Sequence, residues 1–125
     1  MLILDLQAIT DLQSQLADWP AAVRALQEIA DCDGAIEDAA INLALQAGLE
    51  PNTSDRWLEG LAKRYRAQLC TRIATQQPLS DHDLRPLLAA LEESGCPELL
   101  RLPVALWVRS LGIERFCDPL AEKLQ

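Results

Sequence analysis

The chain has 125 residues, of which 50% are hydrophobic and only 4% aromatic, and its formal net charge is −8. That length suits one domain with a real core, and the abundance of Leu and Ala favours helices over sheets. The acidic balance argues against a nucleic-acid-binding protein, because contacts to phosphates require clustered Lys and Arg. We therefore expect one all-α domain over residues 1–125, an irregular or orthogonal bundle of about six or seven helices around residues 35–73.

The first predicted helix covers residues 2–17, and the second covers residues 20–30. In both, apolar residues recur at helical spacing, which predicts one buried stripe on each helix. Trp19 precedes Pro20 and should end the first helix, because the residue before a proline is disfavoured in the α region. Asp18 is expected to cap the second helix. The two stripes are Leu2, Leu6, Ile9, Leu12 or Gln13, and Leu16, and then Val23, Leu26 and Ile29 or Ala30.

A polar turn over residues 31–34 leads into an apolar helix predicted for residues 35–47. The turn imitates part of a calcium-binding loop, but the acid of the first loop position and the bidentate Glu of the twelfth are missing. A tight Asp-Gly turn, with Asp33 capping the next helix, explains the same residues. Segment 31–38 is nevertheless the densest acidic cluster, and it is the first of two places where a small ligand or metal could bind.

The longest helical signal covers residues 53–77. Thr53 or Ser54 can cap this helix, and Pro78 should end it. Its apolar stripe consists of Leu58, Leu61, Ala62, Tyr65, Leu69 and Ile73. Arg72 falls at the margin of that stripe, where a partly desolvated guanidinium requires a carboxylate partner.

Charge is distributed unevenly along the chain. Residues 1–50 contain nine acidic residues and one base, a net charge of −8, whereas residues 54–77 carry +3 and residues 78–125 carry −3. At about 100° per residue, the outward face of the predicted central helix presents Arg56, Lys63 and Arg66. These cations can neutralise acidic neighbours in their own fold, or they can bind an acidic patch on a partner protein.

The fifth predicted helix begins near Ser80, which forms a capping-box pattern with Asp83. Its predicted buried face is Leu84, Leu87, Leu88 and Leu91. The tip Asp81-His82-Asp83 holds the one histidine of the chain and is the second place where a metal could bind. Further on, Pro103 predicts a break before a helix over residues 104–111.

The four cysteines, Cys32, Cys70, Cys96 and Cys117, are 38, 26 and 21 residues apart and include no C-x-x-C pair. Zinc sites and redox motifs usually contain close pairs. The first residues lack the basic region of a signal peptide, and no apolar run approaches the roughly 20 residues that span a bilayer. We therefore expect a cytoplasmic protein with no cofactor, no structural metal and no disulfide.

Two weak echoes leave open a duplicated helical unit. Residues 32–50 resemble residues 96–114 at an offset of 64, and Ala25-Leu26-x-Glu28 recurs as Ala90-Leu91-x-Glu93 at an offset of 65. The echoes consist mainly of Leu, Ala and Gly, which are common in any helical protein.

The sequence contains no Gly-rich loop, no second histidine for a triad and no His-rich metal pattern, so a non-enzymatic role is favoured. The best supported function is a non-catalytic helical protein–protein interaction module, such as an adaptor, assembly factor or small subunit. Its expected partner is a protein with an acidic patch, bound through Arg56, Lys63 and Arg66; neither nucleic acid nor a membrane is expected, and homo-oligomerisation stays open. The alternative is a domain that binds a small ligand or metal, with or without catalysis, at residues 31–38 or 81–83.

Overall fold

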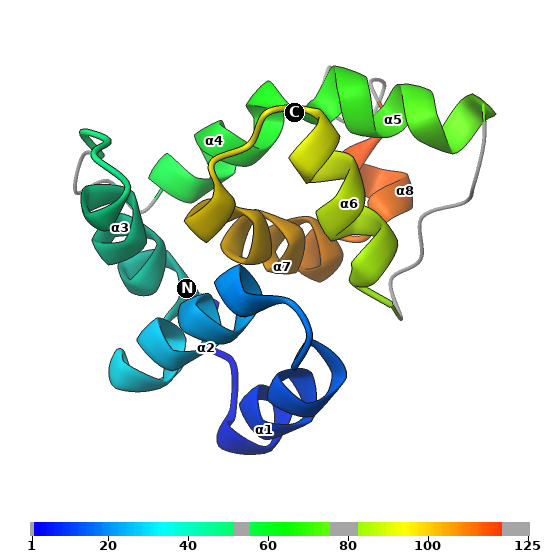
Figure 1. Cartoon of the computed structure of the whole chain (residues 1–125). Coiled ribbons are helices and arrows are strands. Elements are labelled where there is room, and N and C mark those ends of the chain that lie inside the picture. The colour runs from blue at the N-terminus through cyan, green and yellow to red at the C-terminus, as the bar shows by residue number, and fades with distance from the viewer. Residues whose placement is uncertain (1, 52–55, 76–82, 119–125) are drawn as a thin grey trace.

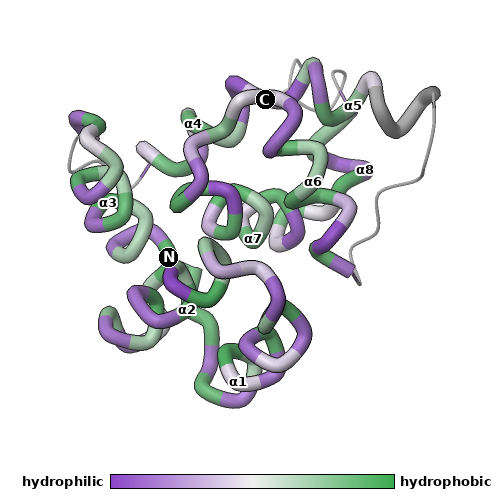
Figure 2. Tube along the Cα trace, in the orientation of Figure 1, coloured by the Kyte–Doolittle hydropathy of each residue, from purple (hydrophilic) through white to green (hydrophobic). Residues whose placement is uncertain are grey.

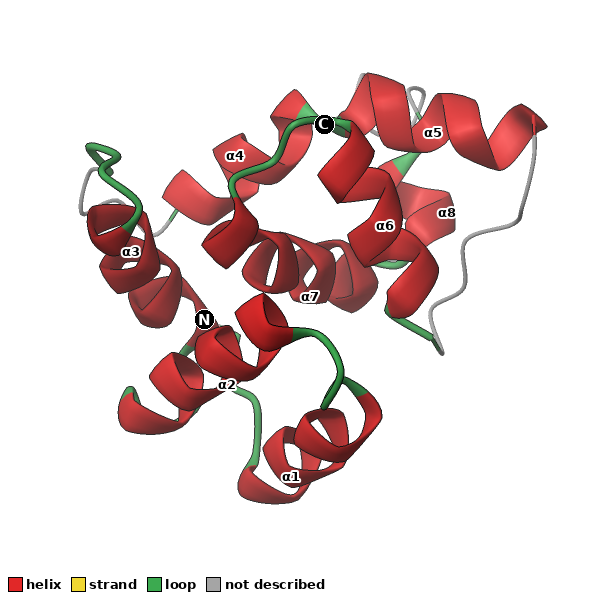
Figure 3. Ribbon diagram, viewed as in Figure 1, coloured by secondary structure: helices red, strands yellow, loops and turns green. Residues whose placement is uncertain are grey.

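The computed structural model describes residues 2–51, 56–75 and 83–118, with the backbone alone for residues 72–75. In these ranges the chain forms eight α-helices and one 3-10 helix, η1, and the all-α class is confirmed (Figure 1). Within the described ranges the ribbon contains helices and loops but no strand (Figure 3), and Ile3 and Ala35 form one isolated β-bridge. The helices are α1 (Leu6–Gln15), α2 (Pro20–Asp31), α3 (Ile36–Gln46), α4 (Trp57–Arg64), α5 (Arg66–Thr75), α6 (Arg85–Glu93), η1 (Glu98–Leu100), α7 (Arg101–Leu111) and α8 (Ile113–Phe116).

Helix α7 occupies the centre of the bundle and packs against α2, α3, α4, α6 and α8 (Figure 1). It can fill this place because it is apolar around most of its circumference. Its buried residues are Leu102, Pro103, Val104, Ala105, Leu106 and Val108. The expectation that the bundle is organised around residues 35–73 is therefore wrong. Helix α3 leaves Leu45 60% exposed, and α5 lies at the edge of the fold.

Pro103 does not interrupt α7, in contrast to the predicted break. It is the third residue of the helix, where a backbone amide has no intrahelical partner, so the missing N–H removes no helical hydrogen bond. Helix η1 runs directly into α7 at Arg101. Residues 98–111 thus form one continuous helical segment.

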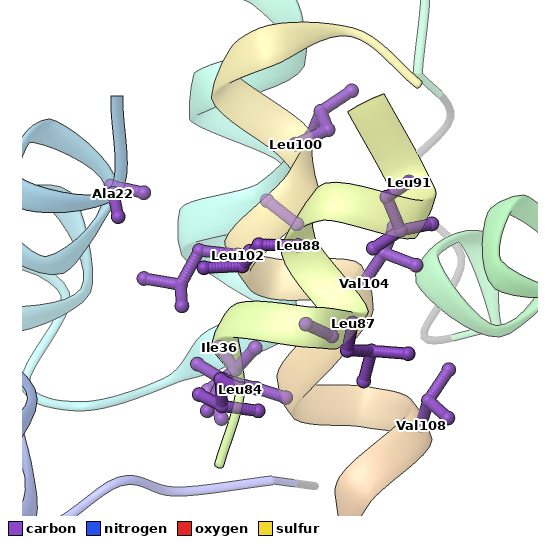
Figure 4. Packing of buried hydrophobic residues seen from close by; sticks show 14 of the residues in the cluster. Ala22, Ile36, Leu84, Leu87, Leu88, Leu91, Leu100, Leu102, Val104 and Val108 are labelled. Atoms are coloured by element: carbon purple, nitrogen blue, oxygen red, sulfur yellow. The ribbon is translucent and has the colours of Figure 1, made fainter. Parts of the chain in front are cut away.

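The core joins α6 closely to α7. The predicted buried face of α6 is confirmed, since Leu84, Leu87, Leu88 and Leu91 are each no more than 3% exposed. These side chains lie against α7, with Val104 and Val108 also labelled in the cluster (Figure 4). Each helix contains both hydrophilic and hydrophobic residues along its length, as expected for helices with one buried side (Figure 2).

The first helix begins later than predicted, because residues 2–4 are extended. The amide of Leu4 donates to the carbonyl of Gly34 over 2.8 Å, and the amide of Ile36 donates to the carbonyl of Leu2 over 3.1 Å. Asp5 then caps α1 by accepting a 2.7 Å hydrogen bond from the Ala8 amide. The pairing with residues 34–36 competes with helix formation, and it leaves Leu6, expected in the core, 76% exposed.

The predicted caps of the next two helices are also wrong. Trp19 is the N-cap of α2 and Ala35 is the N-cap of α3, and neither makes a side-chain capping bond. Asp33 instead adopts a left-handed conformation, with φ of 55°, in the turn that ends α2. It therefore lies too early in the chain to reach the first amides of α3.

The predicted central helix is two helices, α4 and α5, which meet at Tyr65. Tyr65 has φ −100° and ψ 4°, and its amide bonds to the carbonyl of Ala62, three residues back. Both halves have helical propensity, but α4 packs against α7 whereas α5 packs against α6, so the chain must change direction between them. The expected caps Thr53 and Ser54, and the expected stop at Pro78, lie outside the described residues.

A disulfide joins Cys70 of α5 to Cys117, the residue that follows α8, with the two Cα atoms 5.5 Å apart. The expectation of no disulfide is therefore wrong. These cysteines are 47 residues apart in sequence, and the packing of α5 near α8, which sequence spacing does not reveal, brings them together. Cys32, which is half-buried, and Cys96, which is buried, are free thiols.

The helix pairs α2–α3 and α6–α7 follow the same spacing. Helices α2 and α6 begin at residues 20 and 85, and α3 and α7 cover residues 36–46 and 101–111, so each offset is 65 residues. Leu26 and Leu91, which correspond at this offset, are both fully buried. The structure thus agrees with the shorter of the two sequence echoes.

Candidate protein-binding surfaces

The three predicted binding residues do not share one face of one helix. Arg56 is the exposed N-cap of α4 and Lys63 is exposed in its last turn, where its Nζ lies 3.7 Å from Glu59 Oε2. Arg66 begins α5 and is half-buried. The break at Tyr65 separates Arg66 from the other two, because the projection that aligned them assumed a continuous helix.

Arg66 lies against the core instead of pointing wholly outward. Its guanidinium carbon lies 5.0 Å from the centroid of the Phe116 ring, a cation–π distance. Phe116 is 1% exposed and meets Trp107 edge to face, with 6.1 Å between ring centroids. Arg66 therefore helps to hold α5 against α7 and α8.

Replacing Arg66 with Met is expected to lower the free energy of unfolding by about 1 kcal/mol, because the cation–π contact with Phe116 is lost. Arg64→Met, two residues earlier and at an exposed side chain, should change stability by less than about 0.5 kcal/mol. Urea unfolding followed by circular dichroism measures both values. Equal effects of the two substitutions would show that the position over Phe116 carries no stabilisation.

We define the basic surface of α4 as the exposed residues Arg56, Lys63 and Arg64. The opposite side of this helix packs into the core through the buried residues Leu58 and Leu61. Lys63 and Arg64 stand in the last turn, where cations interact favourably with the helix dipole. Arg64 was not among the predicted binding residues, because helical spacing places it on the flank of the apolar stripe, but its side chain is exposed.

At both predicted ligand sites, described carboxylates have partners within the protein. In segment 31–38, Glu37 accepts a 3.2 Å hydrogen bond from the Leu2 amide, and Asp31 accepts one of 3.0 Å from Gln27. Asp83 accepts from the Arg85 amide and pairs with its side chain at 3.4 Å. Within residues 2–51, 56–75 and 83–118, no three His, Cys, Asp or Glu side chains converge to hold a metal. Asp81, His82 and the side chain of Arg72 lie outside the described part.

The two free thiols are poorly suited to nucleophilic chemistry. Burial raises the pKa of the Cys32 thiol, and the negative charge of Glu28 raises it further. Burial raises the pKa of Cys96 to about 11. A nucleophilic cysteine requires the thiolate form, which the raised pKa of each thiol disfavours.

A groove of about 640 Å³ runs along the outer side of α2, and the sequence did not predict it. Ala17, from the turn after α1, and Gln46, the last residue of α3, lie at its borders. The α2 residues that line it are Pro20, Val23, Arg24, Gln27, Glu28 and Asp31. Helical spacing assigned Val23 to the core, but it is 37% exposed and faces this groove.

A hydrogen-bonded network fixes the polar side chains of the groove. Arg24 Nη2 donates to Gln46 Oε1 over 2.6 Å, and Gln46 Nε2 donates to Glu28 Oε1 over 2.8 Å. The thiol of Cys32 lies 3.8 Å from Glu28 Oε2, and the Asn42 amide donates to that sulfur over 3.5 Å. The network ties α2 to α3, so the groove has a defined shape.

Comparisons with protein-family models, curated proteins and solved structures found no match to this chain. Among the described helices, none combines the length and the apolar character required to cross a bilayer.

Proposed function

We propose that this protein is a non-catalytic helical interaction module, an adaptor, assembly factor or small subunit, that binds an acidic patch of another protein through the basic surface of α4. The observation that carries the proposal is the exposure of Arg56, Lys63 and Arg64 on one short helix in which Glu59 is the one acidic residue. The chain as a whole is acidic, with a formal net charge of −8.

The way α4 is held supports this proposal. Its apolar side is buried against α7, so the three cations project from a fixed position. Both side chains of the Lys63–Glu59 ion pair are exposed, so the pair stabilises the fold by at most about 1 kcal/mol. A carboxylate of a partner protein can therefore replace Glu59 at little cost. Such contacts raise the association rate more than the affinity, and salt screens them over about 10 Å at 0.1 M.

Arg66, which the sequence assigned to the binding face, is half-buried over Phe116 and lies outside the basic surface of α4. Its substitution perturbs Phe116 as well, so a loss of binding in an Arg66 variant would not separate the two roles. The decisive variants therefore leave Arg66 in place.

Lys63→Glu combined with Arg64→Glu is expected to abolish capture of the native partners from a lysate of the cells that make the protein. The matched control is Arg85→Glu with Arg115→Glu, two exposed cations on α6 and α8 whose reversal changes the net charge equally. The control should retain capture, and raising the salt concentration should weaken capture by the wild type. Equal recovery with both double variants, after circular dichroism has shown both to be folded, would refute this surface.

We place the protein in the cytoplasm as part of the same proposal. That compartment keeps thiols reduced, so the proposal requires the fold to persist when the Cys70–Cys117 bond is open. Thiol alkylation in intact cells tests it, because recovery of these two cysteines as a disulfide would place the protein in an oxidising compartment.

A further inference from the structure

The groove along α2 follows a single helix face. Its α2 residues, from Pro20 to Asp31, recur at steps of three and one, so they form one row along the helix axis. At about 1.5 Å per residue this row is about 16 Å long, three turns of helix. A straight groove of this length matches the recurring mode in which an amphipathic helix lays anchors spaced at i, i+3, i+4 and i+7 into a surface.

One end of the groove is apolar. Ala17 and Pro20 are exposed there, and Val23 is 37% exposed. Val23 is one of four large hydrophobic residues in the described chain that are this accessible, and it is the one that lines the groove. Covering it removes apolar area from water, which favours an apolar anchor residue on the partner.

The other end carries two carboxylates that no cation neutralises in the described structure. Glu28 accepts from the neutral amide of Gln46 and the thiol of Cys32, and Asp31 accepts from the neutral amide of Gln27. The nearby cation Arg24 donates to the amide oxygen of Gln46. Residues 1–50 together carry a net charge of −8, so the surrounding field also attracts cations.

We propose that this groove binds an amphipathic helix of a partner protein, with one apolar anchor against Val23 and Pro20 and Lys or Arg residues one and two turns further along, opposite Glu28 and Asp31. The groove's length and spacing select a helix, and its uncompensated carboxylates select a basic one. The contact is short, so it belongs to the weak and transient class.

This surface is independent of the basic surface of α4 and has the opposite charge preference. A module with both surfaces joins a basic helix to an acidic protein, which is an adaptor's task. Failure at one surface leaves the other untouched, so the two proposals are tested separately.

The test uses a synthetic helical peptide of about 15 residues with a Leu anchor and Lys at the i+4 and i+8 positions. Fluorescence anisotropy measures its affinity for the full chain, and backbone amide chemical shifts locate the site. The expected result is binding that maps to residues 17–31 and 46 and weakens with salt. The same peptide with Glu in place of Lys should not bind.

Matched variants give the sharper comparison. Asp31→Asn should weaken binding about two- to fivefold, whereas Asp11→Asn should have no effect, although Asp11 accepts an equivalent 2.9 Å bond from Gln7 on α1. Val23→Lys should weaken binding about tenfold or more, whereas Leu45→Lys, at a site that is 60% exposed on α3, should not.

Three results would overturn the proposal. The first is no binding of the Lys peptide at millimolar concentration, and the second is equal binding of the Glu peptide. The third is concentration-dependent self-association of the chain, measured by sedimentation and lost in Val23→Lys, because the occupant would then be a second copy.

Discussion

Replacing both Cys70 and Cys117 with Ser is expected to lower the free energy of unfolding by about 4 kcal/mol. The bond joins positions 47 residues apart, and closing a loop of that size removes conformational entropy from the unfolded chain. The bond also fastens α5 to the end of α8. Among the described side chains of α5, Leu69 is the fully buried one. Urea unfolding of the wild type and the double variant measures the difference.

Reductant provides the matched control for this prediction. It should lower the stability of the wild type by the same amount and leave the Cys70→Ser, Cys117→Ser variant unchanged. An unchanged wild type under reducing conditions would mean that the cross-link does not constrain the unfolded chain. Since domains are usually stable by about 5–15 kcal/mol, a loss of about 4 kcal/mol also decides whether the protein stays folded under reducing conditions.

Gly34→Ala is expected to cost about 2–4 kcal/mol. Gly34 has φ of 87°, which is strained for any residue with a Cβ, and an added methyl group would overlap the carbonyl oxygen of Leu4. That carbonyl belongs to the extended segment whose amide bonds to Gly34, so the methyl group must displace residues 2–4 from the α2–α3 turn. Denaturant unfolding measures the cost, and hydrogen exchange at the Leu4 and Ile36 amides should accelerate.

Gly48→Ala separates strain from overlap. Gly48 has nearly the same conformation, with φ of 80°, but a Cβ there would meet no atom within 4 Å. Its substitution should therefore cost only the strain of the left-handed conformation, about 1 kcal/mol. If both alanine variants lost the same stability, the close approach of Leu4 would have no energetic role.

Where one helix face packs on one neighbour, the sequence was sufficient. The spacing of Leu84, Leu87, Leu88 and Leu91 predicted the buried face of α6, and Leu26 was likewise predicted in the core. Burial at these positions depends on local periodicity, which the sequence displays directly.

The errors share a different physical cause, which is competition from residues far away in the chain. Leu6 fits a helical stripe, but the pairing of residues 2–4 with residues 34–36 delays the helix and exposes it. Tyr65 lies in a run with good helical propensity, and the break there follows from packing on two different helices. Propensity is a weak local preference that such contacts readily override.

The candidate surfaces were predictable only in part. The excess of cations on residues 56–66 was visible in the sequence, but the separation of Arg66 from Arg56 and Lys63 required the end of α4 to be known. The groove combines α2 with Ala17 and Gln46, and no local pattern reports that those segments meet. The same is true of the disulfide.

The central position of α7 has a consequence for how the protein is made. Residues 101–111 emerge from the ribosome after α1 to α6, yet they fill the space between α2, α3, α4 and α6. At a synthesis rate of about 5–20 residues per second, α7 is completed a few seconds after α4, so the apolar side of α4 lacks α7 during that time. During that interval the nascent chain contains α2, α3 and α4 without α7, and their Leu26, Leu43 and Leu58 belong to the same buried cluster as the α7 side chains. Synthesis of this protein therefore includes a period in which chaperones have a surface to bind.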